Sequence, residues 1–90
     1  MYHSDMDPLE KMLKALANKR RLAILRHLKR RRASVGDVAA AIKLSFSSTS
    51  NHLAMLANAG VIEKRQESLV VWHHLPRKPH AVVSEVLKVL

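Results

Sequence analysis

A run of small polar residues at the centre of the chain has the types and spacing for hydrogen-bonding chemistry. The stretch SFSSTSNH, residues 45–52, places hydroxyls, an amide and an imidazole within about two helical turns. Such side chains donate and accept hydrogen bonds at short reach, which suits base edges and phosphates. The residues predicted to contact nucleic acid here are Ser45, Phe46, Ser47, Ser48, Ser50, Asn51 and His52. The alternative is a solvated helix whose serines only cap its first turn.

The distribution of charge favours nucleic acid independently of that run. The chain has 90 residues, with 16 Lys plus Arg against 7 Asp plus Glu and a formal net charge of +9. Half of the basic residues lie between Lys19 and Arg32, where no acidic residue occurs. A polyanion is the natural partner of such a segment. A membrane surface is disfavoured, because the apolar residues of this segment are needed to build the small core. The predicted phosphate contacts are Arg30, Arg31, Arg32, Lys43, Lys64 and Arg65.

Several function classes are excluded by what the sequence contains. The absence of cysteine excludes disulfides, thiolate metal sites and cysteine redox sensing. Ser48 and His52 lie four residues apart, but neither an orienting group nor an oxyanion site accompanies them. We therefore expect no enzyme activity and no cofactor. Apolar runs are too short to span a bilayer and the start is polar, so a cytoplasmic location is expected.

Capping residues and apolar spacing divide the chain into five helices and one hairpin. Helix starts are predicted at Asp7, Asn18, Ser34 and Ser45, whose side chains can accept hydrogen bonds from free backbone N–H groups. Gly60 suits the left-handed position that ends the fourth helix. Two β-prone runs, 61–65 and 69–75, predict a hairpin with its tip at 66–68. A last helix is predicted over roughly 80–90.

The order of these elements predicts a mainly α fold with a small β-hairpin, a winged helix-turn-helix over residues 1–90. Residues 34–60 form the helix-turn-helix, with a three-residue break, and residues 61–75 form the wing. With Thr49, Leu53 and Leu56 facing inward, the other face of the fourth helix is presented to a major groove.

Two aromatic residues lie beside this predicted interface. Trp72 on the hairpin is interpreted as packing at the core or at the base of the wing. Phe46 could contact a thymine methyl group or pack against the third helix, and packing is slightly favoured.

The last helix is apolar on most sides, which predicts that a second subunit covers it. Helices 7–17 and 79–90 are the predicted dimerisation elements. The predicted interface residues are Leu9, Met12, Leu16, Val82, Val83, Val86, Leu87 and Leu90.

Leu13–Leu75 resembles the ArsR/SmtB family of winged-helix repressors. The family pattern LSxSxxSxHLxxLxxAGL is matched by LSFSSTSNHLAMLANAGV, with valine in the final position. The resemblance implies a homodimer joined by its first and last helices, an operator bound in the major groove, and repression of a nearby gene. Family members often carry Gln where Phe46 stands and His where Asn51 stands, so the operator sequence does not carry over. The sequence does not identify an inducing ligand.

The metal ligands of the family are not matched. Metal-sensing members use Cys-x-Cys on the third helix, where this chain has RASVGDV. An intersubunit site formed by His73, His74 or His80 stays open, because a closed site needs three or four convergent ligands. The sequence thus predicts a homodimeric repressor that binds double-stranded DNA. The alternatives are a metal-responsive repressor with histidine ligands and a winged-helix protein-interaction module without DNA binding.

Overall fold

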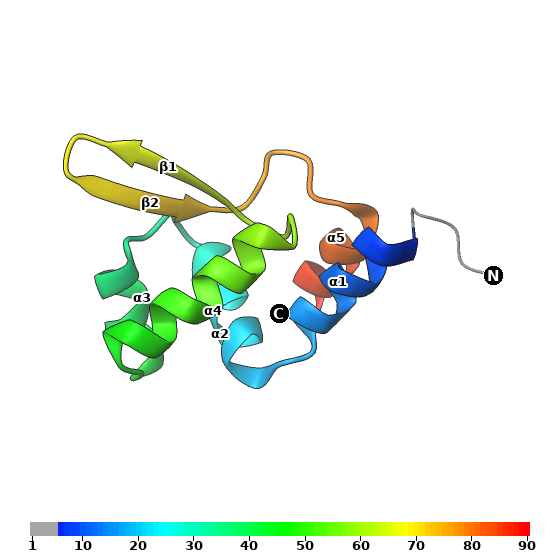
Figure 1. Ribbon diagram of the computed structural model, residues 1–90, viewed down its shortest axis with the longest axis horizontal. Helices are drawn as coiled ribbons and strands as arrows, with labels where there is room; N and C mark the ends of the chain where they lie inside the picture. The colour runs from blue at the N-terminus through cyan, green and yellow to red at the C-terminus, as the bar shows by residue number, and fades with distance from the viewer. Residues whose placement is uncertain (1–5) are drawn as a thin grey trace.

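A computed structural model describes residues 6–90 as five helices and one antiparallel hairpin (Figure 1). In chain order these are α1 (Met6–Leu16), α2 (Lys19–Leu28), α3 (Val35–Ile42), α4 (Phe46–Asn58), β1 (Glu63–Glu67), β2 (Val70–His74) and α5 (Ala81–Lys88). The types and order of the elements are those that the sequence predicts. Of the helices in residues 6–90, none is both long enough and apolar enough to cross a membrane.

The predicted caps of α2 and α3 are confirmed. The Asn18 side-chain oxygen accepts hydrogen bonds from the backbone N–H groups of Arg20 and Arg21, at 2.9 and 3.1 Å. At the start of α3, Ser34 and Asp37 form a reciprocal capping box. These contacts satisfy N–H groups that have no partner within their own helix, and so fix where each helix begins.

The predicted cap of α1 is wrong. The described helix already includes Met6, so Asp7 lies in its first turn and does not cap it. There its carboxylate still interacts favourably with the positive end of the helix dipole.

The predicted tip of the hairpin is also wrong. The strand pairing runs from Glu63 with His74 to Glu67 with Val70, so residues 68–69 form the turn. Ser68 adopts a left-handed conformation there, with φ of 57°. Val61 and Ile62, predicted to begin the first strand, are buried in the core instead. Their burial shifts β1 along the chain, because a residue committed to the core cannot also lie on the projecting wing.

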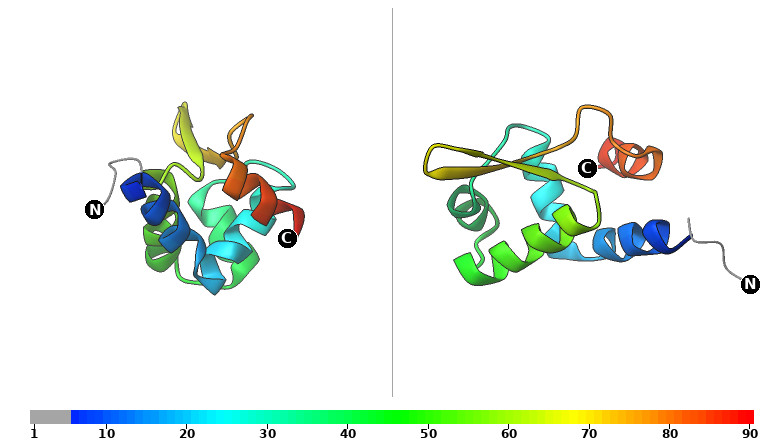
Figure 2. Two further views of the ribbon diagram at one scale, coloured as in Figure 1. Left: turned by 90° about the vertical axis from the view of Figure 1, so that its right-hand side faces the viewer. Right: turned by 45° about the horizontal axis from the view of Figure 1, so that its top comes forward.

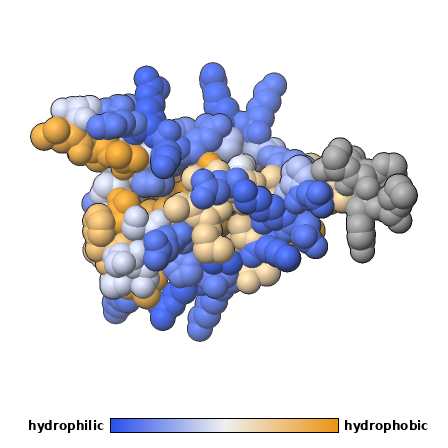
Figure 3. Space-filling view, viewed as in Figure 1, coloured by the Kyte–Doolittle hydropathy of each residue, from blue (hydrophilic) through white to orange (hydrophobic). Residues whose placement is uncertain are grey.

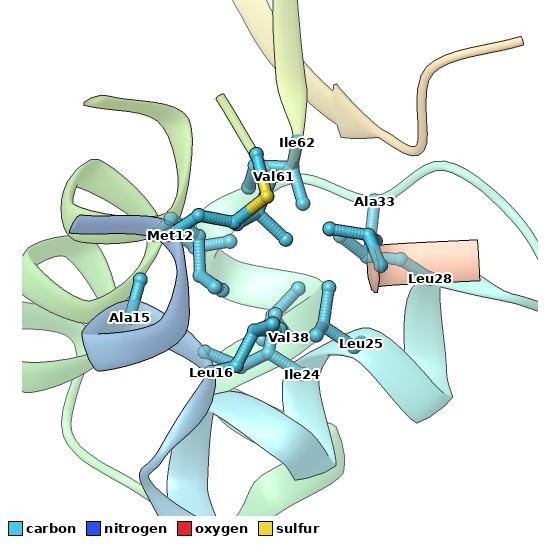
Figure 4. Packing of buried hydrophobic residues seen from close by; sticks show 13 residues of the cluster. Met12, Ala15, Leu16, Ile24, Leu25, Leu28, Ala33, Val38, Val61 and Ile62 are labelled. Carbon is cyan, nitrogen blue, oxygen red and sulfur yellow. The ribbon is translucent and has the colours of Figure 1, made fainter. Parts of the chain in front are cut away.

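One apolar cluster holds α1–α4 and α5 together (Figure 4). Its buried members are Met12, Ala15, Leu16, Ile24, Leu25, Leu28, Ala33, Val38, Leu53, Leu56, Val61, Ile62 and Val83. The labelled side chains of α1, α2 and α3 converge with those of the segment that follows α4 (Figure 4). α4 is thereby fixed along one side, and its other side stays free.

The hairpin is tied to the helical body at its base. The Ala33 N–H donates to the His73 carbonyl at 3.0 Å, and the His73 N–H donates to the Ala33 carbonyl at 2.8 Å. These two bonds anchor β2 to the segment between α2 and α3. The hairpin projects past α3, and its tip lies at the opposite end of the molecule from α1 and α5 (Figures 1 and 2).

Candidate nucleic-acid interface

The turn between α3 and α4 has the three-residue length that the sequence predicts, at residues 43–45. Lys43 takes the left-handed conformation, with φ of 56° and ψ of 51°, and ends α3. Ser45 then caps α4, because its hydroxyl oxygen accepts a hydrogen bond from the Ser48 N–H at 3.1 Å. At its other end, Gly60 has φ of 78° and closes α4 as predicted. The start of α4 is thus fixed at the surface of the molecule.

The inner face of α4 matches the prediction. Thr49, Leu53 and Leu56 are at most 1% exposed. The opposite face carries the polar run. We call the exposed set on this face the α4 surface, namely Phe46, Ser47, Ser48, Asn51 and Ala54. Ser50 and His52, also predicted to contact nucleic acid, are only partly exposed at its edges.

Phe46 does not take the role that the sequence favoured. The residue is 64% exposed at the first position of α4. Packing against α3 is therefore wrong as the main role of this side chain. An exposed aromatic ring on an otherwise polar surface is available to a thymine methyl group, the alternative that the sequence left open.

Arg21 is a buried positioning residue that the sequence analysis missed. It counted there as one cation of the basic stretch, but it is 7% exposed. Its Nε donates to the Ala15 carbonyl at 2.6 Å and its Nη2 donates to the Lys14 carbonyl at 3.1 Å. Arg21 thus satisfies carbonyls at the end of α1. Position 21 is four residues before the buried Leu25, and this helical spacing was the signal for its burial.

The third guanidinium nitrogen of Arg21, Nη1, contacts α4. Its Nη1 donates to His52 Nδ1 at 3.2 Å and to Met55 Sδ at 3.4 Å. Partial burial lowers the pKa of His52, and the charges of Arg21 and Arg20 lower it further. Because arginine has no acceptor, His52 must accept at Nδ1 and carry its proton on Nε2. His52 therefore positions α4 against α1 and α2, whatever its contact with nucleic acid.

One carboxylate, that of Glu67, pairs with two of the cations predicted to bind phosphate at the wing. Arg32 donates to Glu67 at 2.9 Å, and Arg65 lies 3.7 Å from the same carboxylate oxygen. Arg32 also stacks on Trp72, 4.4 Å from the ring centroid, so Trp72 packs against the segment between α2 and α3 at the middle of the hairpin. Of the predicted wing contacts, Lys64 is exposed and enters no ion pair within residues 6–90.

The other predicted phosphate contacts are exposed. Arg30 and Arg31 follow α2, and Lys43 lies in the turn before α4. Arg31 adjoins Arg32, which contacts the wing, whereas Lys43 adjoins the start of α4. The structure thus places cations beside both the wing and the α4 surface.

The tip of the wing is apolar. Leu69 is 96% exposed, and Val70 and Val71 on β2 are 37% and 38% exposed. The space-filling view shows apolar surface along one edge of the hairpin, with hydrophilic surface on the other edge (Figure 3).

Two of the three histidines of the open metal alternative have hydrogen-bond partners of their own, and the third, His73, is buried. His73 is 5% exposed, and burial lowers its pKa. His74 Nδ1 lies 3.1 Å from the Leu75 carbonyl oxygen, and His80 caps α5 by accepting the Val82 N–H at 3.1 Å. Between residues 6 and 90, no three His, Cys, Asp or Glu side chains gather closely enough to hold a metal ion.

The predicted dimer interface is altered by the structure. Met12, Leu16 and Val83 lie in the core of the protomer, at 8%, 6% and 1% exposure, so a second copy cannot cover them. α1 exposes a different stripe, Met6, Leu9 and Leu13. The apolar residues of the last helical segment that remain at least partly exposed are Val82, Val86, Leu87, Val89 and Leu90.

Comparison with known proteins identifies the family. Residues 18–64 match the model of the arsR family of bacterial regulatory proteins. The chain is 38% identical over 76 residues to the transcriptional activator HlyU of Vibrio cholerae, covering 84% of this chain and 70% of that protein. The structure of reduced HlyU superposes with a TM-score of 0.79 at 34% identity, covering 96% of this chain and 87% of that one.

A second solved structure shows the same architecture. The homodimeric winged helix-turn-helix DNA-binding domain from Mycobacterium bovis has a TM-score of 0.82 and 27% identity, covering 96% of this chain and 77% of that one. The fold class predicted from the sequence is thus confirmed, and so is the resemblance on which it rested. The chain belongs to the arsR family of bacterial regulatory proteins.

Proposed function

We propose that the whole chain, residues 1–90, acts as one domain that binds double-stranded DNA sequence-specifically as a homodimer and represses transcription. The observation that carries this proposal is the two-sided character of α4. Thr49, Leu53 and Leu56 fix one side in the core, and the α4 surface presents hydroxyls and an amide on the other. A rigid helix with short polar side chains outward fits the width and hydrogen-bonding pattern of a major groove.

The charges beside this surface support the same function. Lys43 adjoins the start of α4, and Lys64 and Arg65 lie on β1 of the wing. Cations on both sides of a recognition helix can bind the phosphates that flank the groove, which fixes the register of the helix without specifying sequence. In this arrangement the α4 surface specifies the sequence, and Asn51 is its best donor–acceptor group for adenine.

The homodimer rests on the apolar ends of the fold. α1 exposes Met6, Leu9 and Leu13, which stand three and four residues apart and form one stripe. Val89, directly after α5, is 82% exposed. Both helices lie at the end of the molecule away from the wing (Figures 1 and 2). The related domain from Mycobacterium bovis is described as homodimeric, and a two-fold arrangement would place two α4 helices on successive grooves.

The direction of regulation is proposed to be repression by occlusion, because a dimer bound across a promoter covers DNA that polymerase needs. The relative HlyU is named an activator, so the test has to measure the sign. We would select bound duplexes from a random pool, locate them upstream of genes by footprinting, and transcribe those templates in vitro. Repression predicts fewer transcripts with protein, whereas more transcripts would reverse the direction. Failure to retain any duplex would favour the protein-interaction alternative.

A further inference from the structure

A basic groove runs along α2, and of the residues predicted to contact nucleic acid only Arg30 lines it. Its volume is about 730 Å³, which lies within the range of small-molecule sites. No residue of α4 or of the hairpin lines it. The basic lining residues are Lys19, Arg20, Arg26, His27, Lys29 and Arg30, and no acidic residue accompanies them. We call this feature the α2 groove.

The cations of the α2 groove have no carboxylate partners in the described chain. The ion pairs within residues 6–90 involve Glu10, Glu63, Glu67 and Glu85, and each binds a cation outside the groove. Among the side chains of the basic lining residues, only that of Lys29 has a hydrogen bond within residues 6–90, which it donates to the Leu87 carbonyl at 2.7 Å. Like charges crowded around one hollow repel each other, so a bound anion would relieve that repulsion as well as gain its own attraction.

The rest of the lining is apolar, which narrows the class of ligand. It consists of Ala23 on α2, Ala41 and Ile42 in the last turn of α3, and Leu90. An inorganic anion would use the cations and leave this apolar surface in water. An anion that carries an aliphatic chain or a ring would use both, because apolar burial and charge pairing then add.

We propose that the α2 groove binds an amphipathic organic anion, such as a carboxylate with an aliphatic chain, and that this ligand weakens DNA binding. The ligand would contact Ile42, which directly precedes the left-handed turn at Lys43 and the cap at Ser45. It would also neutralise cations of α2, and so lower the positive potential on which DNA affinity depends. The regulatory part rests on the proposed function, whereas the binding part does not.

The binding part is tested on the full chain without DNA. Calorimetry would measure decanoate binding to the wild type and to the double variant Lys19→Gln/Arg26→Gln, both exposed positions of the groove. The matched control is Arg77→Gln/Lys78→Gln, which removes the same charge from the exposed segment before α5. We expect the groove variant to lose about tenfold in affinity and the control to stay within about twofold. Equal losses in both variants would overturn the proposal.

Two further probes separate the contributions of charge and apolar surface. 1-Decanol has the chain without the charge, and inorganic phosphate has charge without the chain. Each should bind the wild type at least about tenfold more weakly than decanoate. Phosphate binding as tightly as decanoate would show that the apolar lining contributes nothing, and would overturn the proposed class of ligand.

The regulatory part is tested by fluorescence anisotropy on a selected duplex. Decanoate at a concentration that just saturates the wild type should weaken DNA binding by about fivefold in the wild type and in the control, and by clearly less in the groove variant. If decanoate does not bind at all and the groove variant alone loses affinity for every duplex, the α2 groove is a phosphate contact and the proposal is wrong. A chain that binds no duplex would refute the proposed function, and calorimetry would still decide the ligand.

Discussion

Arg21 and His52 join α2 to α4 through a hydrogen bond of 3.2 Å from Nη1 to Nδ1. The same guanidinium binds the Lys14 and Ala15 carbonyls, so one buried cation connects α1, α2 and α4. α1 carries the apolar stripe assigned to the dimer, and α4 carries the surface assigned to DNA. Arg21 therefore sets the geometry between the two proposed interfaces.

Loss of Arg21 should destabilise the fold. Arg21→Met keeps the length and apolar stem of the side chain and leaves two carbonyls and His52 without their donor. We expect a loss of about 1–3 kcal/mol in the free energy of unfolding, measured by urea denaturation. The exposed neighbour Arg20 provides the control, since Arg20→Met should change stability by less than about 0.5 kcal/mol. Equal effects of the two substitutions would show that the buried network contributes nothing.

Acid should destabilise the protein in the range where histidine titrates. The pKa of His52 and of His73 is lowered from the usual 6.5, in both cases mainly by burial. The unfolded chain therefore binds more protons than the folded one near that pH. The contribution of these two neutral histidines to the stability of the fold is present above pH 6.5, and it is lost as pH falls through their lowered pKa values. Urea midpoints at about pH 7.5 and 5.5 should show the decrease.

A variant isolates the share of His52 in this pH effect. His52→Asn can still offer a side-chain oxygen to Arg21 but does not titrate. The decrease between the two pH values should become smaller than in the wild type, with the remainder due to His73. A decrease of unchanged size would remove His52 from the account.

The dimer should depend on the exposed stripe of α1. Leu13 is 46% exposed and lies outside the core cluster, so Leu13→Asp should not unfold the protomer. It would place a charge in the proposed apolar interface. Sedimentation should show a dimer of 10.2-kDa chains for the wild type and a monomer for this variant. Lys11→Asp, on the other side of the same helix, should remain dimeric. A wild-type monomer at micromolar concentration would contradict the proposal.

Most of the fold could be predicted because its signals are local. Asn18 and Ser34 cap helices through residues two or three positions away, and Gly60 ends α4 by its own backbone conformation. The errors occur where distant contacts decide. Val61 is β-prone, but it is buried in the core. The first strand of the wing therefore begins later in the chain than the sequence predicts.

The site was less predictable than the fold for the same reason. Nothing in the local sequence distinguishes the buried Arg21 from its exposed neighbour Arg20, except its register with the apolar stripe of α2. Arg32 likewise counted as a free cation, and only the folded hairpin brings Glu67 and Trp72 to it. The outward direction of Asn51 followed directly from helical spacing and the buried Leu53 and Leu56.

Salt should weaken the complex with DNA strongly. If the dimer makes about eight phosphate contacts, the slope of log K against log salt should be about −7. The chain supports this number of contacts with a net charge of +9 and exposed cations beside α4 and the wing. The measurement is a set of anisotropy titrations on one selected duplex at several salt concentrations. A slope near zero would exclude a complex dominated by phosphates.

The central claim is that the α4 surface recognises bases while the flanking cations bind phosphates. The most direct test compares Asn51→Ala with Arg31→Ala in paired competition assays, using a selected duplex and its scrambled version at one salt concentration. Asn51→Ala should cost about 1–3 kcal/mol on the selected duplex and far less on the scrambled one. Arg31→Ala should weaken both duplexes alike, because phosphates carry no sequence. If both variants lose affinity in the same ratio on the two duplexes, Asn51 does not recognise bases.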